Sequence, residues 1–193
     1  MIEFQKKHML HRIFIAINLP KAVKEELLSI QEQYLEIPAK WTKIENLHLT
    51  LAFLGNRNEE EVAKIIEIIK ELSKNYAPFS LSFKNICYGP SLKNPKMIWR
   101  KIELSNELRI IKSGLDEALL KNINFELDKK GFNPHVTLAR LRMWDFQKMN
   151  PEERTIQQID KDLSFDVQSI DVMQSVLKRT GAEYTILESI KLS

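Results

Sequence analysis

A chain of 193 residues, with 44% hydrophobic and 28% charged residues, has the composition of a soluble globular protein with a substantial core. Its formal net charge of +3 neither requires nor excludes a polyanionic partner, because local patches of charge matter more than the total. The single cysteine, Cys87, excludes an intramolecular disulfide and favours the reducing cytoplasm, and no apolar run approaches the roughly 20 residues of a membrane-spanning helix.

The chain is expected to form one domain. Residues 1–10 show no hydrophobic period and are predicted to be a flexible leader ahead of a single domain at 11–193. No low-complexity linker divides that domain, and a monomer is the default oligomeric state.

Hydrophobic periodicity predicts strands and helices that follow one another along the chain. Strands are expected where apolar residues alternate or form short runs, and helices where apolar residues recur every three or four positions. In chain order the predicted elements are strand 12–17, helix 21–35, strand 47–55, helix 58–72, strands 79–88 and 96–104, helix 105–119, strand 134–140, and strands 163–177 and 184–192. This order predicts an α+β fold with largely antiparallel sheets flanked by helices.

Two of the predicted strands carry near-copies of one motif, LHLTLAF at 47–53 and PHVTLAR at 134–140. Apolar and polar residues alternate in each copy, which is typical of a strand with one buried face. His48 and Thr50 therefore lie on the polar face of one strand, and His135 and Thr137 on the polar face of the other. The repetition predicts two pseudo-symmetric lobes around a central cleft, to which each contributes a histidine. Two imidazoles in one cleft are able to divide the tasks of general acid and general base.

The chain resembles the two-histidine phosphoesterase superfamily, and in particular the RNA 2′,3′-cyclic phosphodiesterases of the LigT type. The similarity covers nearly the whole chain after the leader. It is carried by the two motifs and by residues 12–17, Trp41, Asn46, 53–55 and 174–184. The resemblance implies a bilobal LigT-like fold and hydrolysis of RNA 2′,3′-cyclic phosphate ends to a 2′-phosphate. It implies no cofactor and no metal.

The resemblance also implies roles for the motif residues. His48 and His135 are the expected catalytic pair, with His48 assigned as general acid and His135 as general base, although the sequence does not determine which is which. Thr50, Thr137 and Arg140 are expected to bind the phosphoryl oxygens, since hydroxyls and a guanidinium donate hydrogen bonds to developing negative charge.

Phe53 is expected to stack on the terminal nucleobase, as aromatic residues do with unpaired RNA bases. Strict alternation, however, places Phe53 and Arg140 on the face opposite the histidines, whereas the family places both positions in the cleft. A β-bulge near the end of each motif strand would reconcile the two.

Two tryptophans and several basic residues outside the motifs are expected to have mainly structural roles. Trp41 and Trp99 are expected to pack in the core or on strands. Five basic residues are candidates for contact with an RNA backbone, although a solvated surface is the favoured interpretation: Lys40, Lys43, Arg100, Lys178 and Arg179.

Three alternatives to cyclic phosphodiester hydrolysis remain open. One is a 2′-5′ RNA ligase or 2′-5′ phosphodiesterase that uses the same histidine pair. Another is a non-catalytic module that binds RNA ends. The third, a metallohydrolase with His48 and His135 as ligands, is disfavoured because no carboxylate or thiol ligand accompanies them.

Overall fold

The computed structural model describes residues 10–128, 131–156, 162–179 and 181–193. The predicted leader at 1–10 lies outside the described residues except for its last position. The described elements, in chain order, are β1 (His11–Asn18), α1 (Lys21–Glu32), β2 (Ala39–Trp41), η1 (Ile44–Asn46), β3 (His48–Arg57), α2 (Glu59–Ser73), β4 (Phe79–Gly89), β5 (Met97–Ile102), α3 (Asn106–Asn122), β6 (His135–Leu141), α4 (Met143–Lys148), η2 (Pro151–Arg154), β7 (Ser164–Val167), β8 (Ser169–Lys178) and β9 (Gly181–Lys191).

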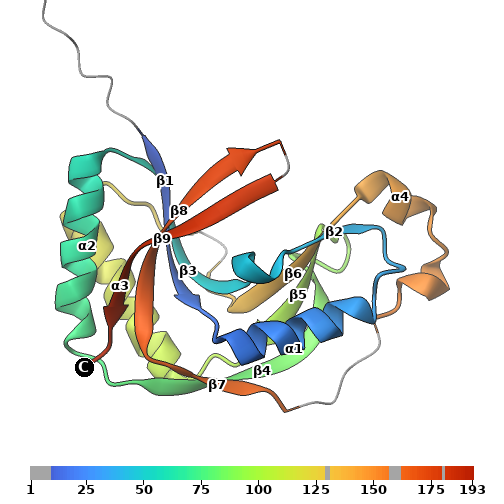
Figure 1. The fold of residues 1–193 in the computed structure, drawn as a ribbon, viewed down its shortest axis with the longest axis horizontal. Helices are drawn as coiled ribbons and strands as arrows, with labels where there is room; N and C mark the ends of the chain where they lie inside the picture. Colours follow the sequence, from blue (N-terminus) through green and yellow to red (C-terminus); the bar gives the residue numbers. More distant parts are fainter. Residues whose placement is uncertain (1–9, 129–130, 157–161, 180) are drawn as a thin grey trace, which may run out of the picture.

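The strands form one curled sheet in the order β7-β4-β5-β6-β3-β1-β8-β9, with β2 added to β6 (Figure 1). Every described strand pair is antiparallel, so the α+β prediction is confirmed. The two motif strands, β3 and β6, are neighbours at the centre of the sheet, and each has three further strands beyond it. This arrangement gives the two pseudo-symmetric halves that the repeated motif predicts.

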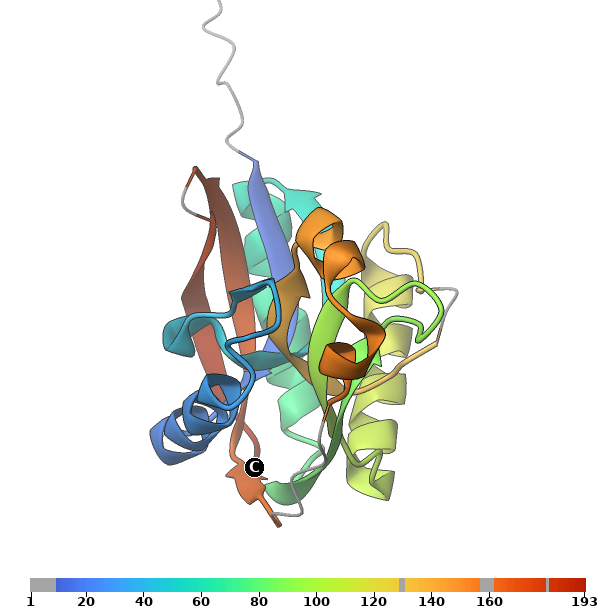
Figure 2. The same cartoon turned by 90° about the vertical axis from the view of Figure 1, so that its right-hand side faces the viewer.

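The main core lies between one face of this sheet and the apolar stripes of the long helices. Buried side chains of α1, α2 and α3 belong to a single cluster with the inward-facing residues of the strands. Figure 2 shows the β8–β9 hairpin rising beside β1 on the side of the sheet away from α3. A second, small cluster packs on the other face of β1 and β8, and consists of Phe14, Ala16 and Met173 with Tyr184 against it.

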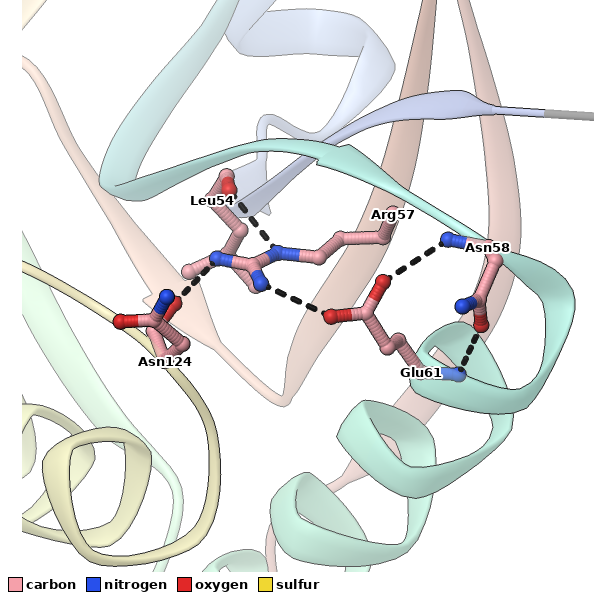
Figure 3. Close-up of polar contacts among 5 residues, drawn as sticks. All are labelled: Leu54, Arg57, Asn58, Glu61 and Asn124. Atoms are coloured by element: carbon pink, nitrogen blue, oxygen red, sulfur yellow. Dashed lines mark hydrogen bonds and ion pairs between the residues drawn. The ribbon is translucent and has the colours of Figure 1, made fainter.

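Hydrogen bonds at the end of β3 connect this strand to α2 and to the segment after α3 (Figure 3). Asn58 and Glu61 form a capping box: Asn58 Oδ1 accepts from Glu61 N at 2.9 Å, and Glu61 Oε2 accepts from Asn58 N at 3.0 Å. Arg57 donates to Glu61 Oε1 at 3.0 Å, to the Leu54 carbonyl at 3.0 Å and to the Asn124 carbonyl at 2.6 Å. The end of the motif strand is thereby fixed by a local cap and by one contact with a segment distant in sequence.

The structure differs from the sequence prediction at several places. The strand predicted at 163–177 is two strands, β7 and β8, which pair with β4 and β1 on opposite halves of the sheet, and the helix predicted at 21–35 ends at Glu32. The first motif strand continues past Gly55 to Arg57, because Gly55 adopts a φ of +74° within the strand instead of ending it. The short strand β2 was not predicted, since three residues are too few to show a period. The interpretation of Arg100 as a surface residue is wrong: its side chain lies on the core face of β5 and is 1% exposed. Among the described residues, no helix has the length and apolarity needed to span a bilayer.

Candidate active site

The two motif strands meet through the pair Leu49 and Val136, which face one another in antiparallel register. Continuing this register by one residue in each direction places His48 opposite Thr137 and Thr50 opposite His135. The two His-x-Thr pairs are therefore related by a local twofold axis at the centre of the sheet. Each imidazole therefore lies on the same face of the sheet, opposite the threonine of the other motif. His48 lines the cleft on this face, whereas His135 and the two motif threonines are not among the lining residues.

A bulge in β3 turns Phe53 toward the cleft. The register between β1 and β3 skips Leu51, and the consecutive residues Leu51 and Ala52 are both buried. Alternation is thereby shifted by one residue, so that Phe53 lies on the same face as His48. Its ring is 70% exposed and lines the cleft. The conflict between strict alternation and the resemblance is resolved by this bulge.

The same bulge occurs at the same place in β6. The register between β5 and β6 skips Leu138, and Leu138 and Ala139 are both buried. Arg140 is consequently turned to the face of His135, where it is exposed and lines the cleft. The two motifs thus share their bulge as well as their histidines, and Arg140 is the counterpart of Phe53.

A buried glutamine on α1 donates to the carbonyl of Leu138, the residue at the β6 bulge. The Leu138 carbonyl accepts from Thr42 N at 2.8 Å and from Gln31 Nε2 at 3.0 Å. Gln31 Nε2 also donates to the Thr42 carbonyl at 3.1 Å, and the Gln31 side chain is only 2% exposed. Gln31 therefore holds the bulge that directs Arg140 and, with it, the segment after β2 that lines the cleft. This role was not predicted from the sequence, because a glutamine among polar helix residues gives no signal by itself.

His48 is held as the neutral Nδ1–H tautomer. Its Nδ1 lies 2.7 Å from the Asn46 carbonyl, which can only accept, so Nε2 is the free acceptor and receives the Thr50 hydroxyl at 3.0 Å. The rings of Phe14 and Tyr184 pack against the imidazole, each with its centroid 5.1 Å away. Burial by these groups lowers the pKa of His48 to about 4, and the charges of Lys24 and His135 act in the same direction.

His135 has the matching backbone bond but a different aromatic neighbour. Its Nδ1 donates to the Asn133 carbonyl at 2.6 Å, which again leaves Nε2 as the acceptor. The indole of Trp99 stacks on the imidazole with centroids 3.8 Å apart and planes at 22°, so the expected packing tryptophan directly supports a motif histidine. Burial lowers the pKa of His135 as well, with a smaller contribution from the charge of Lys101. Both rings are therefore neutral at neutral pH in the empty cleft.

The cleft beside the histidines has a volume of about 470 Å³ and a basic and aromatic lining. It includes His48 and Asn46, the aromatic residues Phe14, Trp41, Phe53 and Tyr184, and the basic residues Arg12, Lys40, Lys43 and Arg140. The β8–β9 hairpin closes one side, held by a bond of 2.9 Å from Asn46 Nδ2 to the Ala182 carbonyl. A larger hollow of about 590 Å³ between the start of α1 and β7 contains neither motif histidine. Within the described ranges, no group of three or more His, Cys, Asp or Glu residues is placed to hold a metal ion.

The pKa of His48 leads to a testable pH dependence. We expect the His48 imidazole signals in NMR spectra of the free protein to titrate near pH 4, and those of His135 below the ordinary value of 6.5. Inorganic phosphate bound in the cleft is expected to raise both pKa values, because a nearby anion favours the charged ring. Unchanged titrations in saturating phosphate would contradict a phosphoryl site between the two rings.

The lowered pKa of His48 also predicts how the free energy of unfolding depends on pH. A histidine whose pKa is lower in the folded state binds its proton more readily when the protein is unfolded. The contribution of His48 to the free energy of unfolding is therefore complete above pH 6.5 and is lost as the pH falls toward 4. For His48 the loss amounts to at most about 3 kcal/mol. Urea unfolding of wild type and of His48→Gln at pH 7 and pH 4.5 measures it, and the variant is expected to show the smaller loss.

Comparison with known proteins gives consistent matches. The family described as LigT like Phosphoesterase matches residues 17–99. The RNA 2′,3′-cyclic phosphodiesterase of Methanocaldococcus jannaschii is 30% identical over 178 residues, which cover 92% of this chain and 98% of that protein. The protein of the same name from Aquifex aeolicus is 28% identical over 183 residues, covering 94% of this chain and 97% of its own.

A solved structure shows the same fold at similar identity. The crystal structure of the Thermus thermophilus protein TT0787 matches with a TM-score of 0.81 and 29% identity, covering 94% of this chain and 97% of that one. The twofold arrangement of the motifs is thus accompanied by sequence similarity along nearly the full length of both proteins. On these grounds the chain belongs to the LigT-like phosphoesterases of the two-histidine superfamily.

Proposed function

We propose that this protein hydrolyses RNA 2′,3′-cyclic phosphate ends to 2′-phosphate ends by acid–base catalysis with His48 and His135, without a metal ion. The observation that carries the proposal is the pair of His-x-Thr strands related by a local twofold axis, beside a basic cleft that His48 and Arg140 line. The relatives named RNA 2′,3′-cyclic phosphodiesterase support the same substrate class, an RNA or nucleotide that ends in a cyclic phosphate.

The proposed reaction breaks one P–O bond and forms another. Nε2 of His135 accepts a proton from water, and the water oxygen bonds to phosphorus. The bond from phosphorus to O3′ breaks, and protonated Nε2 of His48 donates the proton that makes O3′ a hydroxyl. The two histidines lie on opposite sides of the local twofold axis. This placement suits a reaction in which the attacking water oxygen, the phosphorus and the leaving O3′ are in line.

The acid role of His48 depends on the substrate. Its pKa of about 4 in the free cleft means that the ring is neutral until a phosphate approaches. The negative charge of the cyclic phosphate raises that pKa, and the Thr50 hydroxyl is then released from Nε2 to donate to a phosphoryl oxygen. Thr137 occupies the equivalent position beside His135. Their roles, and those of Arg140 toward the phosphoryl group and Phe53 toward the terminal base, are part of the proposal.

The fold supports two further parts of the proposal. One chain supplies both histidines to one continuous sheet, so that a monomer contains the complete site, and residues 11–193 act as one domain. The reducing cytoplasm suits a chain with a single cysteine.

The test is product analysis on an oligonucleotide that ends in a 2′,3′-cyclic phosphate, carried out in EDTA. The expected result is conversion to a 2′-phosphate, with an oligonucleotide ending in a 3′-phosphate monoester unchanged as the control. A 2′-5′-linked oligonucleotide in parallel detects the alternative phosphodiester. Folded protein that binds the cyclic end without turning it over would overturn the proposal in favour of a binding module, and loss of turnover in EDTA would overturn its metal independence.

A further inference from the structure

The lining of the cleft is rich in basic residues. Four of its residues are basic, and no Asp or Glu is among the described residues that line it. Two of the four, Lys40 on β2 and Arg140 on β6, face one another directly in antiparallel register. An anion close to this pair is attracted by both charges.

Lys40 extends from β2 across the mouth of the cleft to the β8–β9 hairpin. A Cβ placed on Gly181, the first residue of β9, would lie 2.8 Å from Lys40 Nζ. Gly181 also has a φ of +137°, so backbone conformation and space both favour glycine there. The Lys40 ammonium therefore lies between the two sides of the mouth, at the level of Arg140.

The position of Lys40 along β6 shows which part of a substrate it faces. β3 contacts β6 at Val136, next to His135, whereas β2 pairs with the far end of β6, at 139–141. Arg140 is the last residue of the second motif, and Lys40 is its register partner on β2. Lys43, which also lines the cleft, follows Lys40 along the chain and forms an exposed ion pair of 3.9 Å with Glu45.

We propose that Lys40 forms a subsite for the phosphodiester that precedes the terminal nucleotide, so that this protein favours oligonucleotides over mononucleotides with the same cyclic phosphate. The inference rests on the proposed function, since it assumes that the reacting phosphate lies between His48 and His135. A mononucleotide has no such phosphodiester and leaves the Lys40 subsite empty. Lys40 is thus a specificity-determining residue for substrate length.

The test compares kcat/KM for 2′,3′-cyclic AMP with kcat/KM for a trinucleotide that ends in 2′,3′-cyclic AMP. Wild type is expected to favour the trinucleotide by about tenfold or more, the effect of one charge-assisted bond to phosphate. Lys40→Met keeps the aliphatic stem and is expected to bring this ratio close to one, while Lys40→Arg restores it. Lys64→Met, which removes an exposed lysine from α2, is the matched control and should leave the ratio unchanged.

Binding provides a readout that does not depend on turnover. Fluorescence anisotropy with the 2′-phosphorylated trinucleotide at several salt concentrations is expected to give a slope of log Kd against log[salt] that is about 0.7 smaller in magnitude for Lys40→Met than for wild type. A wild-type ratio near one, or a ratio and salt slope that Lys40→Met leaves unchanged, would overturn the inference. If no cyclic phosphate is turned over by folded protein, the proposed function fails, and the anisotropy slopes alone decide on the subsite.

Discussion

Replacing either motif histidine with alanine is expected to lower kcat for a cyclic phosphate end by a factor of about 10² to 10⁴. The reason is that, in the proposed mechanism, each Nε2 either accepts a proton from water or donates one to the leaving oxygen. His48→Ala and His135→Ala are measured in EDTA with a 2′,3′-cyclic phosphate oligonucleotide. Because the two rings act in one step, the double variant is expected to lose much less than the product of the two separate losses.

His11 on β1 offers a matched control for the histidine variants. It lies on the same sheet as His48 but is not part of the cleft lining, so His11→Ala should retain wild-type turnover. Far-UV circular dichroism and thermal unfolding of all variants separate lost chemistry from lost fold. A folded His48→Ala or His135→Ala protein with more than a tenth of wild-type kcat would contradict the proposed pair.

A substrate with sulfur in place of the bridging O3′ separates the acid from the base. A thiolate leaves without a proton, so a variant that lacks the general acid recovers activity on it, whereas a variant that lacks the general base does not. We expect recovery for His48→Ala and none for His135→Ala. The reverse pattern would assign His135 as the acid, which is the order that the strongly lowered pKa of His48 favours in the absence of substrate charge.

The second large effect is expected at Arg140. Arg140→Ala removes the charge-assisted donor that we propose for the phosphoryl oxygens, and the loss of one such donor typically lowers kcat by a factor of about 10² to 10³. Arg140→Lys keeps the charge but not the planar fork, so only part of the activity is expected to return. Steady-state kinetics at saturating substrate measures this loss. A change confined to KM would instead place Arg140 in ground-state binding.

A substitution at Gln31 tests whether the β6 bulge orients the Arg140 side chain. Gln31→Met removes the amide that donates to the Leu138 carbonyl at the β6 bulge and keeps a similar volume. If Gln31 acts by holding Arg140 in place, the variant lowers kcat by about tenfold in wild type but has little further effect in Arg140→Ala. Equal losses in both backgrounds would show that Gln31 only stabilises the fold.

Local patterns were sufficient for much of the fold. The helix at 59–73 begins where Asn58 and Glu61 form a capping box, and the helix at 106–122 begins after Ser105, whose hydroxyl accepts from Leu108 N at 3.2 Å. These contacts involve neighbours in sequence, so their pattern is visible before any tertiary contact forms. The alternation of the motif strands was visible for the same reason.

The bulges and the buried polar contacts were not predictable in this way. Whether alternation continues past Thr50 or Thr137 depends on how β1 and β5 pair with the motif strands, and a bulge is a property of that pairing. Strict alternation therefore placed Phe53 and Arg140 on the wrong face, although the resemblance implied their position in the cleft. Arg100 was assigned to the surface for a similar reason, because alternation on β5 is decided by the core that covers it.

The sequence by itself determined the residue types of the site: two His-x-Thr strands, an arginine and an aromatic at matching positions, and the helices and strands around them. These follow from local pattern and from the repeat. Only the tertiary structure decided that the strands meet at Leu49 and Val136, that both bulges turn the fifth residue after the histidine into the cleft, and that Lys40 faces Arg140. The physical reason is that pairing partners, burial and the pKa values of the two histidines depend on residues far apart in the chain.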